Sequence, residues 1–160
     1  MPENFSVDLE TIYPVIEEKL LAGGTVTFGP KGISMLPLIR QGVDSIKLAP
    51  ITKKLQKYDV PLYRRANGQF VLHRVISEKN GIYTMRGDNQ IINEYGINHS
   101  QIIGIMTEII KPEGVIKVSD KEYIKYTKKQ VLKQTIKSFI FKLKVLLKKI
   151  LIKLNLYKKN

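Results

Sequence analysis

The sequence contains no cysteine, so the chain can form neither a disulfide framework nor a thiolate nucleophile or thiolate metal site. It also lacks a run of the roughly 18–20 apolar residues that a transmembrane helix requires. Residues 1–8 carry acidic side chains where a signal peptide has basic ones, and no apolar run follows them. The sequence therefore excludes cysteine chemistry and gives no sign of a membrane span or of export.

Acidic residues are nearly missing from the last forty positions. Residues 121–160 contain 13 Lys and one Glu, a net charge of +12, whereas residues 1–120 carry a net charge of only +1. At 160 residues, the chain is long enough for one domain with a real core and an appendage. We therefore expect a body over residues 1–120 and a basic tail over residues 121–160 that interacts with an anionic partner.

Short β-branched segments separated by Gly and Asn turns predict a mainly β body. A helix over residues 9–21 precedes it. Its regular part is expected to begin near Thr11, which places Pro14 in the first turn, and Gly23-Gly24 is expected to end it. Pro61 predicts that its strand lies at an edge of a sheet. The expected strands cover residues 25–28, 45–48, 60–64, 69–76, 82–86, 102–110 and 114–118.

Three stretches of the body carry side chains that could form a catalytic site. Ser34 lies in a predicted turn, His73 in a predicted strand, and Asp88 in a Gly-Asp-Asn turn. Each has an ordinary structural interpretation: a solvated hydroxyl, a half-buried strand histidine and a turn carboxylate. Together they offer a nucleophile, a base and an acid that orients the base. His99 is the only other histidine, and its polar neighbours predict a surface position.

In this order the stretches resemble the signal peptidase I family, and within it the endoplasmic-reticulum and sporulation type, in which His replaces the usual catalytic Lys. The matching segments are Ser34-Met35-x-Pro37 for the nucleophile, His73-Arg74-Val75 for the base and Gly87-Asp88-Asn89 for the third box. In reticulum-type members a second acid follows the Asp of that box by six residues, and here this position is Glu94. The resemblance covers roughly residues 24–110 and leaves Asp88 and Glu94 as alternative partners of His73.

The resemblance implies the coiled, mostly β fold shared by signal peptidases and self-cleaving repressor proteases. It implies a serine endopeptidase that cleaves an extended leader or signal peptide after a small residue, with no metal or organic cofactor. Many bacterial members have a Ser two positions before the nucleophile, where this chain has Gly32. Binding of the oxyanion and substrate would then depend on backbone groups of Gly32, Ser34 and Met35.

The tail is predicted to form an amphipathic helix over residues 131–154. Its broad apolar face is formed by Leu132, Ile136, Phe139, Ile140, Leu143, Leu147, Ile150, Leu151 and Leu154. The cations that flank this face or lie opposite it are Lys137, Lys142, Lys144, Lys148, Lys149 and Lys153. Phe141, Val145 and Ile152 interrupt the polar side. This pattern favours a peripheral helix in the interface of an anionic membrane, at the cytoplasmic face or after export by an unrecognised route.

Other interpretations of the tail and of the body remain open at this point. The tail helix could pack on its own body or on a second copy, and nucleic acid ranks third because the tail has no Arg. The body could be a non-catalytic peptide-binding module of the same fold. It could also be an autoprotease, for which Ala22-Gly23 is a small-residue pair of the right kind.

Overall fold

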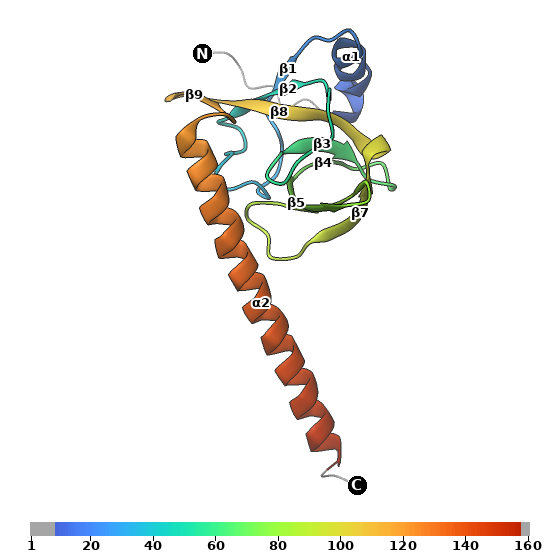
Figure 1. Ribbon diagram of the computed structural model, residues 1–160, viewed down its shortest axis with the longest axis vertical. Coiled ribbons are helices and arrows are strands. Elements are labelled where there is room, and N and C mark those ends of the chain that lie inside the picture. Colours follow the sequence, from blue (N-terminus) through green and yellow to red (C-terminus); the bar gives the residue numbers. More distant parts are fainter. Residues whose placement is uncertain (1–8, 158–160) are drawn as a thin grey trace.

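A computed structural model describes residues 9–157, with the side chains of residues 9–153 (Figure 1). The acidic residues 1–8 and the side chain of Leu154, both used in the sequence analysis, lie outside the described part. The described chain is mainly β, with two antiparallel sheets between an N-terminal and a C-terminal helix. This confirms the predicted mainly β body with a helix before it and a helix after it.

The larger sheet has the strand order β1-β2-β8-β3-β4, and β9 pairs with β8. Its strands are β1 (Val26–Phe28), β2 (Ser45–Ala49), β3 (Pro61–Arg64), β4 (Phe70–Leu72), β8 (Ile102–Lys111) and β9 (Gly114–Lys117). The prediction that the strand with Pro61 is an edge strand is wrong, because β3 lies between β8 and β4. Pro61 is tolerated there as the first residue of the strand. The strand order ends at β1 on one side and at β4 on the other, so β4 is an edge strand.

The smaller sheet has the order β5-β6-β7, with strands β5 (Arg74–Lys79), β6 (Ile82–Arg86) and β7 (Glu94–Asn98). The single strand predicted over residues 69–76 is wrong, because the chain passes from one sheet to the other at His73. Residues 71–75 are all buried, so both faces of this segment are covered and its sequence shows no alternation. Strand β7 and the 3₁₀ turn His99–Gln101 (η1) were not predicted, since their residues are mostly polar.

Two apolar clusters fill the two sides of the larger sheet. One joins this sheet to helix α1 (Leu9–Leu21) through residues such as Ile16, Leu20, Leu48 and Leu62. The other lies between the sheets and includes Tyr63, Val75 and Met85. Because successive strand residues point to opposite faces, Leu62 enters the first cluster and Tyr63 the second.

Helix α1 begins two residues earlier than predicted, so Pro14 lies inside it and not in its first turn. The pair Ala22-Gly23 continues its hydrogen bonds, with the amide of Ala22 donating to Glu18 O and that of Gly23 to Leu20 O. Gly23 then takes a φ of 78°, which glycine adopts without strain. The pair is therefore held at a helix end and is not an extended segment beside Ser34.

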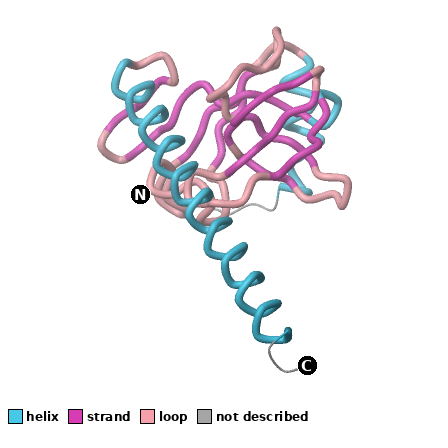
Figure 2. The backbone as a smooth tube through the Cα atoms, turned by 60° about the horizontal axis from the view of Figure 1, so that its bottom comes forward, coloured by secondary structure: helices cyan, strands magenta, loops and turns pink. Residues whose placement is uncertain are grey.

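Helix α2 (Lys121–Tyr157) is continuous and longer than the predicted amphipathic segment. Its first part packs on the body, where Tyr123 joins the first apolar cluster and Gln130, Gln134 and Ser138 are buried. Beyond Ser138 every described side chain is exposed. Figures 1 and 2 show this second part extending past the body.

Candidate catalytic site

Ser34 lies in the turn that follows β1 and is partly exposed. Buried Met35, Leu38 and Ile39 anchor the segment that follows it, and the Leu36–Pro37 peptide is cis. Gly32 has a φ of 99°, a conformation that other residues rarely adopt. The apolar anchors thus hold the turn in the core while Ser34 stays accessible.

The Gly-Asp-Asn turn packs directly against the backbone of Ser34. A Cβ on Gly87 would lie 2.6 Å from Ser34 O, so this position requires glycine. The amide of Asn89 donates to Ser34 O at 2.8 Å, and Asn89 Nδ2 donates to Ile33 O at 3.2 Å. Two residues of the turn therefore position the Ser34 segment, a role that the sequence analysis did not assign.

Ser34 and His73 line one pocket with a volume of about 220 Å³. Its lining also includes residues 30–32, Gln69, the three residues of β4 and Gln90. The pocket thus lies beside the edge strand β4 of the larger sheet. In the described chain, no hydrogen bond joins Ser34 Oγ to His73; catalytic hydrogen bonds are often long before substrate binds.

His73 is 3% exposed, and its Nδ1 lies 3.2 Å from the hydroxyl of Tyr63. Burial, which disfavours the charged ring, lowers the pKa of His73 to about 4, although Glu94 acts in the opposite direction. His73 is therefore neutral at physiological pH and can accept a proton.

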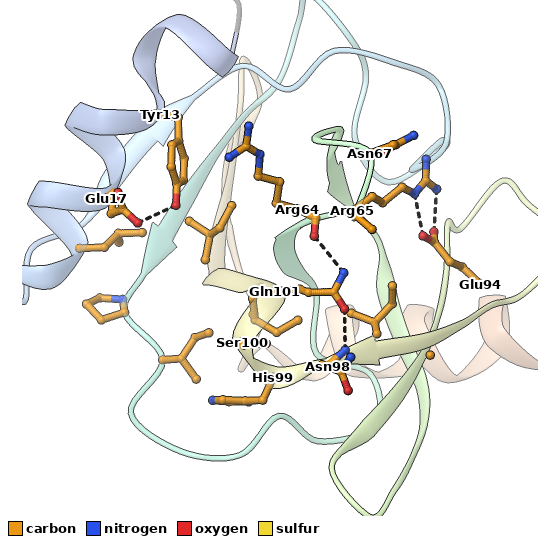
Figure 3. Close-up of a pocket in the computed structure, with 18 of the residues that line it drawn as sticks. Tyr13, Glu17, Arg64, Arg65, Asn67, Glu94, Asn98, His99, Ser100 and Gln101 are labelled. Carbon is orange, nitrogen blue, oxygen red and sulfur yellow. Dashed lines mark hydrogen bonds and ion pairs between the residues drawn. The ribbon is translucent and has the colours of Figure 1, made fainter.

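Glu94 is the carboxylate nearest to His73. Its Oε2 lies 3.7 Å from His73 Nδ1 and accepts a hydrogen bond of 2.7 Å from the hydroxyl of Tyr63. Arg65 donates to both of its oxygens at 2.6 Å, and Figure 3 shows this paired contact. The hydrogen bonds from Arg65 lower the pKa of Glu94, so it is ionised at neutral pH.

Asp88 does not contact His73. Both of its oxygens accept hydrogen bonds of 2.7 Å from Arg74, and the two side chains are buried. Burial opposes the charge of Arg74, but the hydrogen bonds with Asp88 outweigh it and raise the pKa of Arg74. Of the two alternative acids, the structure thus brings Glu94 close to His73 and pairs Asp88 with the next residue along the chain.

The proposed oxyanion groups have different surroundings. The amide of Gly32 already donates to Gln41 Oε1 at 2.6 Å, so it is engaged in this structure. The amides of Ser34 and Met35 make no hydrogen bond within the described residues. An oxyanion on the carbonyl oxygen of a peptide attacked by Ser34 would therefore depend on these two amides more than on Gly32.

A larger cavity of about 1090 Å³ opens between α1, the β3–β4 turn and the β7–η1 segment (Figure 3). It shares Arg65 and Glu94 with the surroundings of His73 but contains neither Ser34 nor His73. His99 lies at this cavity, exposed as predicted, with Nδ1 3.2 Å from the hydroxyl of Tyr83. Residues 9–157 include no cluster of three His, Asp or Glu arranged to hold a metal ion.

The predicted tail lysines all lie on α2. Those at 142, 144, 148, 149 and 153 are in the part beyond the body, together with the exposed apolar side chains of Phe139, Leu143, Leu147 and Ile150. No described helix has a stretch that is long and apolar enough to cross a membrane.

No protein-family model matches this sequence, and a search of curated proteins finds no significant match.

Four residues around the site were not predicted from the sequence: Tyr63, Arg65, Arg74 and Asn89. Arg74 directly follows the candidate base, and Asn89 completes the third box, so their positions could have marked them. Tyr63 gives no comparable sign, because a tyrosine among apolar strand residues is usually part of the core.

Proposed function

We propose that the protein is a serine endopeptidase of the signal peptidase type, with the coiled β fold of that family and of the repressor proteases. The observation that carries the proposal is that Ser34 and His73, which lie 39 positions apart in the sequence, line one pocket. The Gly-Asp-Asn turn packs against Ser34, so all three boxes of the resemblance meet at the same place.

The substrate in this proposal is an extended leader or signal peptide with a small residue before the cleaved bond. It pairs with the free edge of β4 and so passes Ser34, since an edge strand offers unpaired backbone groups to a peptide.

In the proposed mechanism, Ser34 Oγ attacks the scissile carbonyl while His73 takes the hydroxyl proton. The amides of Ser34 and Met35 stabilise the oxyanion. His73 then gives the proton to the leaving amine, and water attacks the acyl-enzyme with His73 again as the base. Glu94 lies close enough to stabilise the imidazolium that forms.

Cleavage of a peptide library tests this proposal. Ser34→Ala and His73→Ala should each lower cleavage by about 10³-fold or more, because the nucleophile and its base act as a unit. Ser100→Ala and His99→Gln are matched controls at exposed positions and should cleave like the wild type. Equal cleavage by all five proteins would refute the proposal.

Two alternatives within the same fold give different results in these experiments. A peptide-binding module would bind without turnover, and Ser34→Ala would leave its binding unchanged. An autoprotease would cut its own chain, which the intact mass of wild type and Ser34→Ala after long incubation would reveal.

We also propose that the second part of α2 lies in the interface of an anionic membrane. From Tyr123 onward the chain has no acidic residue, so a second copy of the helix would place Lys against Lys without a counter-charge. Packing on its own body is not seen, since the side chains of 139–153 are exposed. Anionic lipid both covers apolar side chains and attracts Lys, each worth about 1 kcal/mol near the surface.

Two matched triple variants of the whole chain test the membrane proposal. Replacing Leu143, Leu147 and Ile150 by Ser should abolish pelleting with vesicles that contain phosphatidylserine, since these residues share the broad apolar face. Replacing Phe141, Val145 and Ile152 by Ser should have little effect, since these residues lie on the opposite side of the helix. All six side chains are similarly exposed. Equal pelleting by both variants, or equal pelleting with neutral vesicles, would refute the proposal.

A further inference from the structure

Tyr63 lies between the candidate acid and the candidate base. Its side chain projects from β3 into the cluster between the sheets and is fully buried. The hydroxyl is 2.7 Å from Glu94 Oε2 and 3.2 Å from His73 Nδ1, whereas Glu94 and His73 themselves are 3.7 Å apart. The shortest hydrogen-bonded path from the carboxylate to the ring therefore runs through this hydroxyl.

The chemistry of the three groups decides the direction of each hydrogen bond. Glu94 is paired with Arg65 and is ionised, so its oxygens can only accept. Burial and the neighbouring Glu94 raise the pKa of Tyr63, so the phenol keeps its single proton. That proton is donated to Glu94, and the phenol oxygen is left as an acceptor. The contact at 3.2 Å then requires a proton on His73 Nδ1.

We infer that Tyr63 is a positioning residue that transmits the effect of Glu94 to His73 and holds the ring in the tautomer with Nδ1 protonated. This inference rests on the proposed function. In that tautomer Nε2 carries the free lone pair, which is the form a general base needs to accept the proton of Ser34.

The arrangement differs from a triad in which the carboxylate bonds the histidine directly. When His73 accepts the Ser34 proton at Nε2, Nδ1 keeps its proton and donates to the Tyr63 oxygen, and Tyr63 keeps its proton toward Glu94. No proton moves along the chain of three groups. The negative charge of Glu94 stabilises the imidazolium from 3.7 Å, and Arg65 keeps that carboxylate in place.

The protein contains a comparison pair for this arrangement. Tyr83 and His99 repeat the same contact, with hydroxyl to Nδ1 at 3.2 Å and ring centroids 6.2 Å apart, the values also found for Tyr63 and His73. In the described chain, no carboxylate is hydrogen-bonded to Tyr83. The Tyr83 proton is therefore free to point toward His99, and the Tyr63 proton is not.

The ¹⁵N chemical shifts of the His73 ring at pH 7 test the inference directly. The parent protein for this measurement is the full chain with two substitutions: His99→Gln, which leaves one histidine and so assigns the signals, and Ser34→Ala, which prevents turnover. We expect Nδ1 to be protonated. Glu94→Leu removes the acceptor of the Tyr63 proton, which should release the hydroxyl proton toward His73 and shift the ring to the Nε2-protonated form. Either a parent protein already protonated at Nε2, or a Glu94→Leu variant with unchanged shifts, would overturn the inference.

Cleavage kinetics provide the second measurement, with Ser34 and His99 restored. Tyr63→Phe should lower kcat by about 10–100-fold with little change in KM, because the ring loses its orienting acceptor but the substrate contacts remain. Tyr83→Phe is the matched control and should leave both constants and the His73 shifts unchanged. A Tyr63→Phe protein that folds and cleaves like the wild type would overturn the positioning role. If the wild type cleaves no peptide, the proposed function fails, while the ¹⁵N shifts still test the hydrogen-bond order.

Discussion

Asp88 and Glu94 lie six positions apart in the sequence. Asp88 pairs with Arg74, and Glu94 lies close to the neighbouring residue His73, but the two carboxylates differ in burial. Asp88 is buried, and both of its oxygens are bonded to buried Arg74. Glu94 is partly exposed, and its ion-pair partner Arg65 is also reached by solvent. Consecutive residues of one segment thus each face a different carboxylate.

The Asp88–Arg74 pair is part of the packing between the body and helix α2. The backbone oxygen of Asp88 accepts hydrogen bonds from Gln130 and Gln134 of α2 at 2.6 and 2.9 Å. Tyr123 of the same helix accepts a hydrogen bond from Arg74 at 3.0 Å. The helix that carries the basic tail is therefore joined to the turn that positions Ser34.

Membership of the third box thus does not decide which acid lies beside His73. A fully buried ion pair is suited to a fixed structural role, since its geometry cannot change without exposing a charge to the apolar interior. A partly solvated carboxylate next to His73 can respond when the ring becomes charged. Replacing Asp88 is thus expected to lower stability, and replacing Glu94 is expected to affect activity.

The largest effect is expected from Asp88→Asn. This change leaves the buried guanidinium of Arg74 without a counter-charge, with Tyr58 O, the Tyr123 hydroxyl and one amide oxygen as its acceptors, which should cost about 3–5 kcal/mol of unfolding free energy. Urea unfolding monitored by circular dichroism should show a lower midpoint with an unchanged slope.

Glu94→Gln is the matched change at the carboxylate beside His73. It should lower the unfolding free energy by no more than about 1 kcal/mol, since ion pairs that solvent reaches contribute little. Equal losses of stability in the two variants would contradict the assignment of a structural role to Asp88 and a functional role to Glu94.

A smaller effect is expected from pH. With its pKa lowered to about 4, His73 stays neutral as the pH falls from 7 to 5, so kcat/KM should change by less than about twofold over this range. Loss of activity should set in near pH 4, whereas an unperturbed histidine would lose it near 6.5. A pH–rate profile that falls with a midpoint near 6.5 would show that His73 is not buried in the active form.

The same titration affects stability in a defined direction. Between pH 6.5 and about 4 the unfolded chain binds a proton at this position and the folded chain does not. The contribution of His73 to the unfolding free energy is therefore present above pH 6.5 and declines as the pH falls toward 4.

Much of the local structure could be predicted from the chain itself. Helix α1, the β-hairpin turns and the long Lys-rich helix follow from glycine positions and from the spacing of apolar residues, which act over a few positions. The change of sheet at His73 could not be predicted in this way. Residues 71–75 are buried on both sides by partners from distant segments, so the local pattern resembles one continuous strand.

The residues of the candidate site also divide into those that the sequence predicts and those that only the packing identifies. Ser34, His73 and the Gly-Asp-Asn turn could be named from the sequence, because each stands in a short recognisable motif. The partners of the two acids could not be named from the sequence. Arg74 contacts Asp88, and Tyr63 contacts Glu94, only because the two sheets and α2 pack together. Tyr63 in particular has no local sign of its role.

By itself, the sequence determined a mainly β body, a basic helix at its end, and a serine and a histidine in ordered motifs. These depend on periodicity, turn residues and charge, which the chain carries locally. Only the tertiary structure decided that Asp88 pairs with buried Arg74 while Glu94 lies beside the histidine. The reason is physical: burial and hydrogen-bond partners come from segments far apart in the sequence, and they determine what a carboxylate can do.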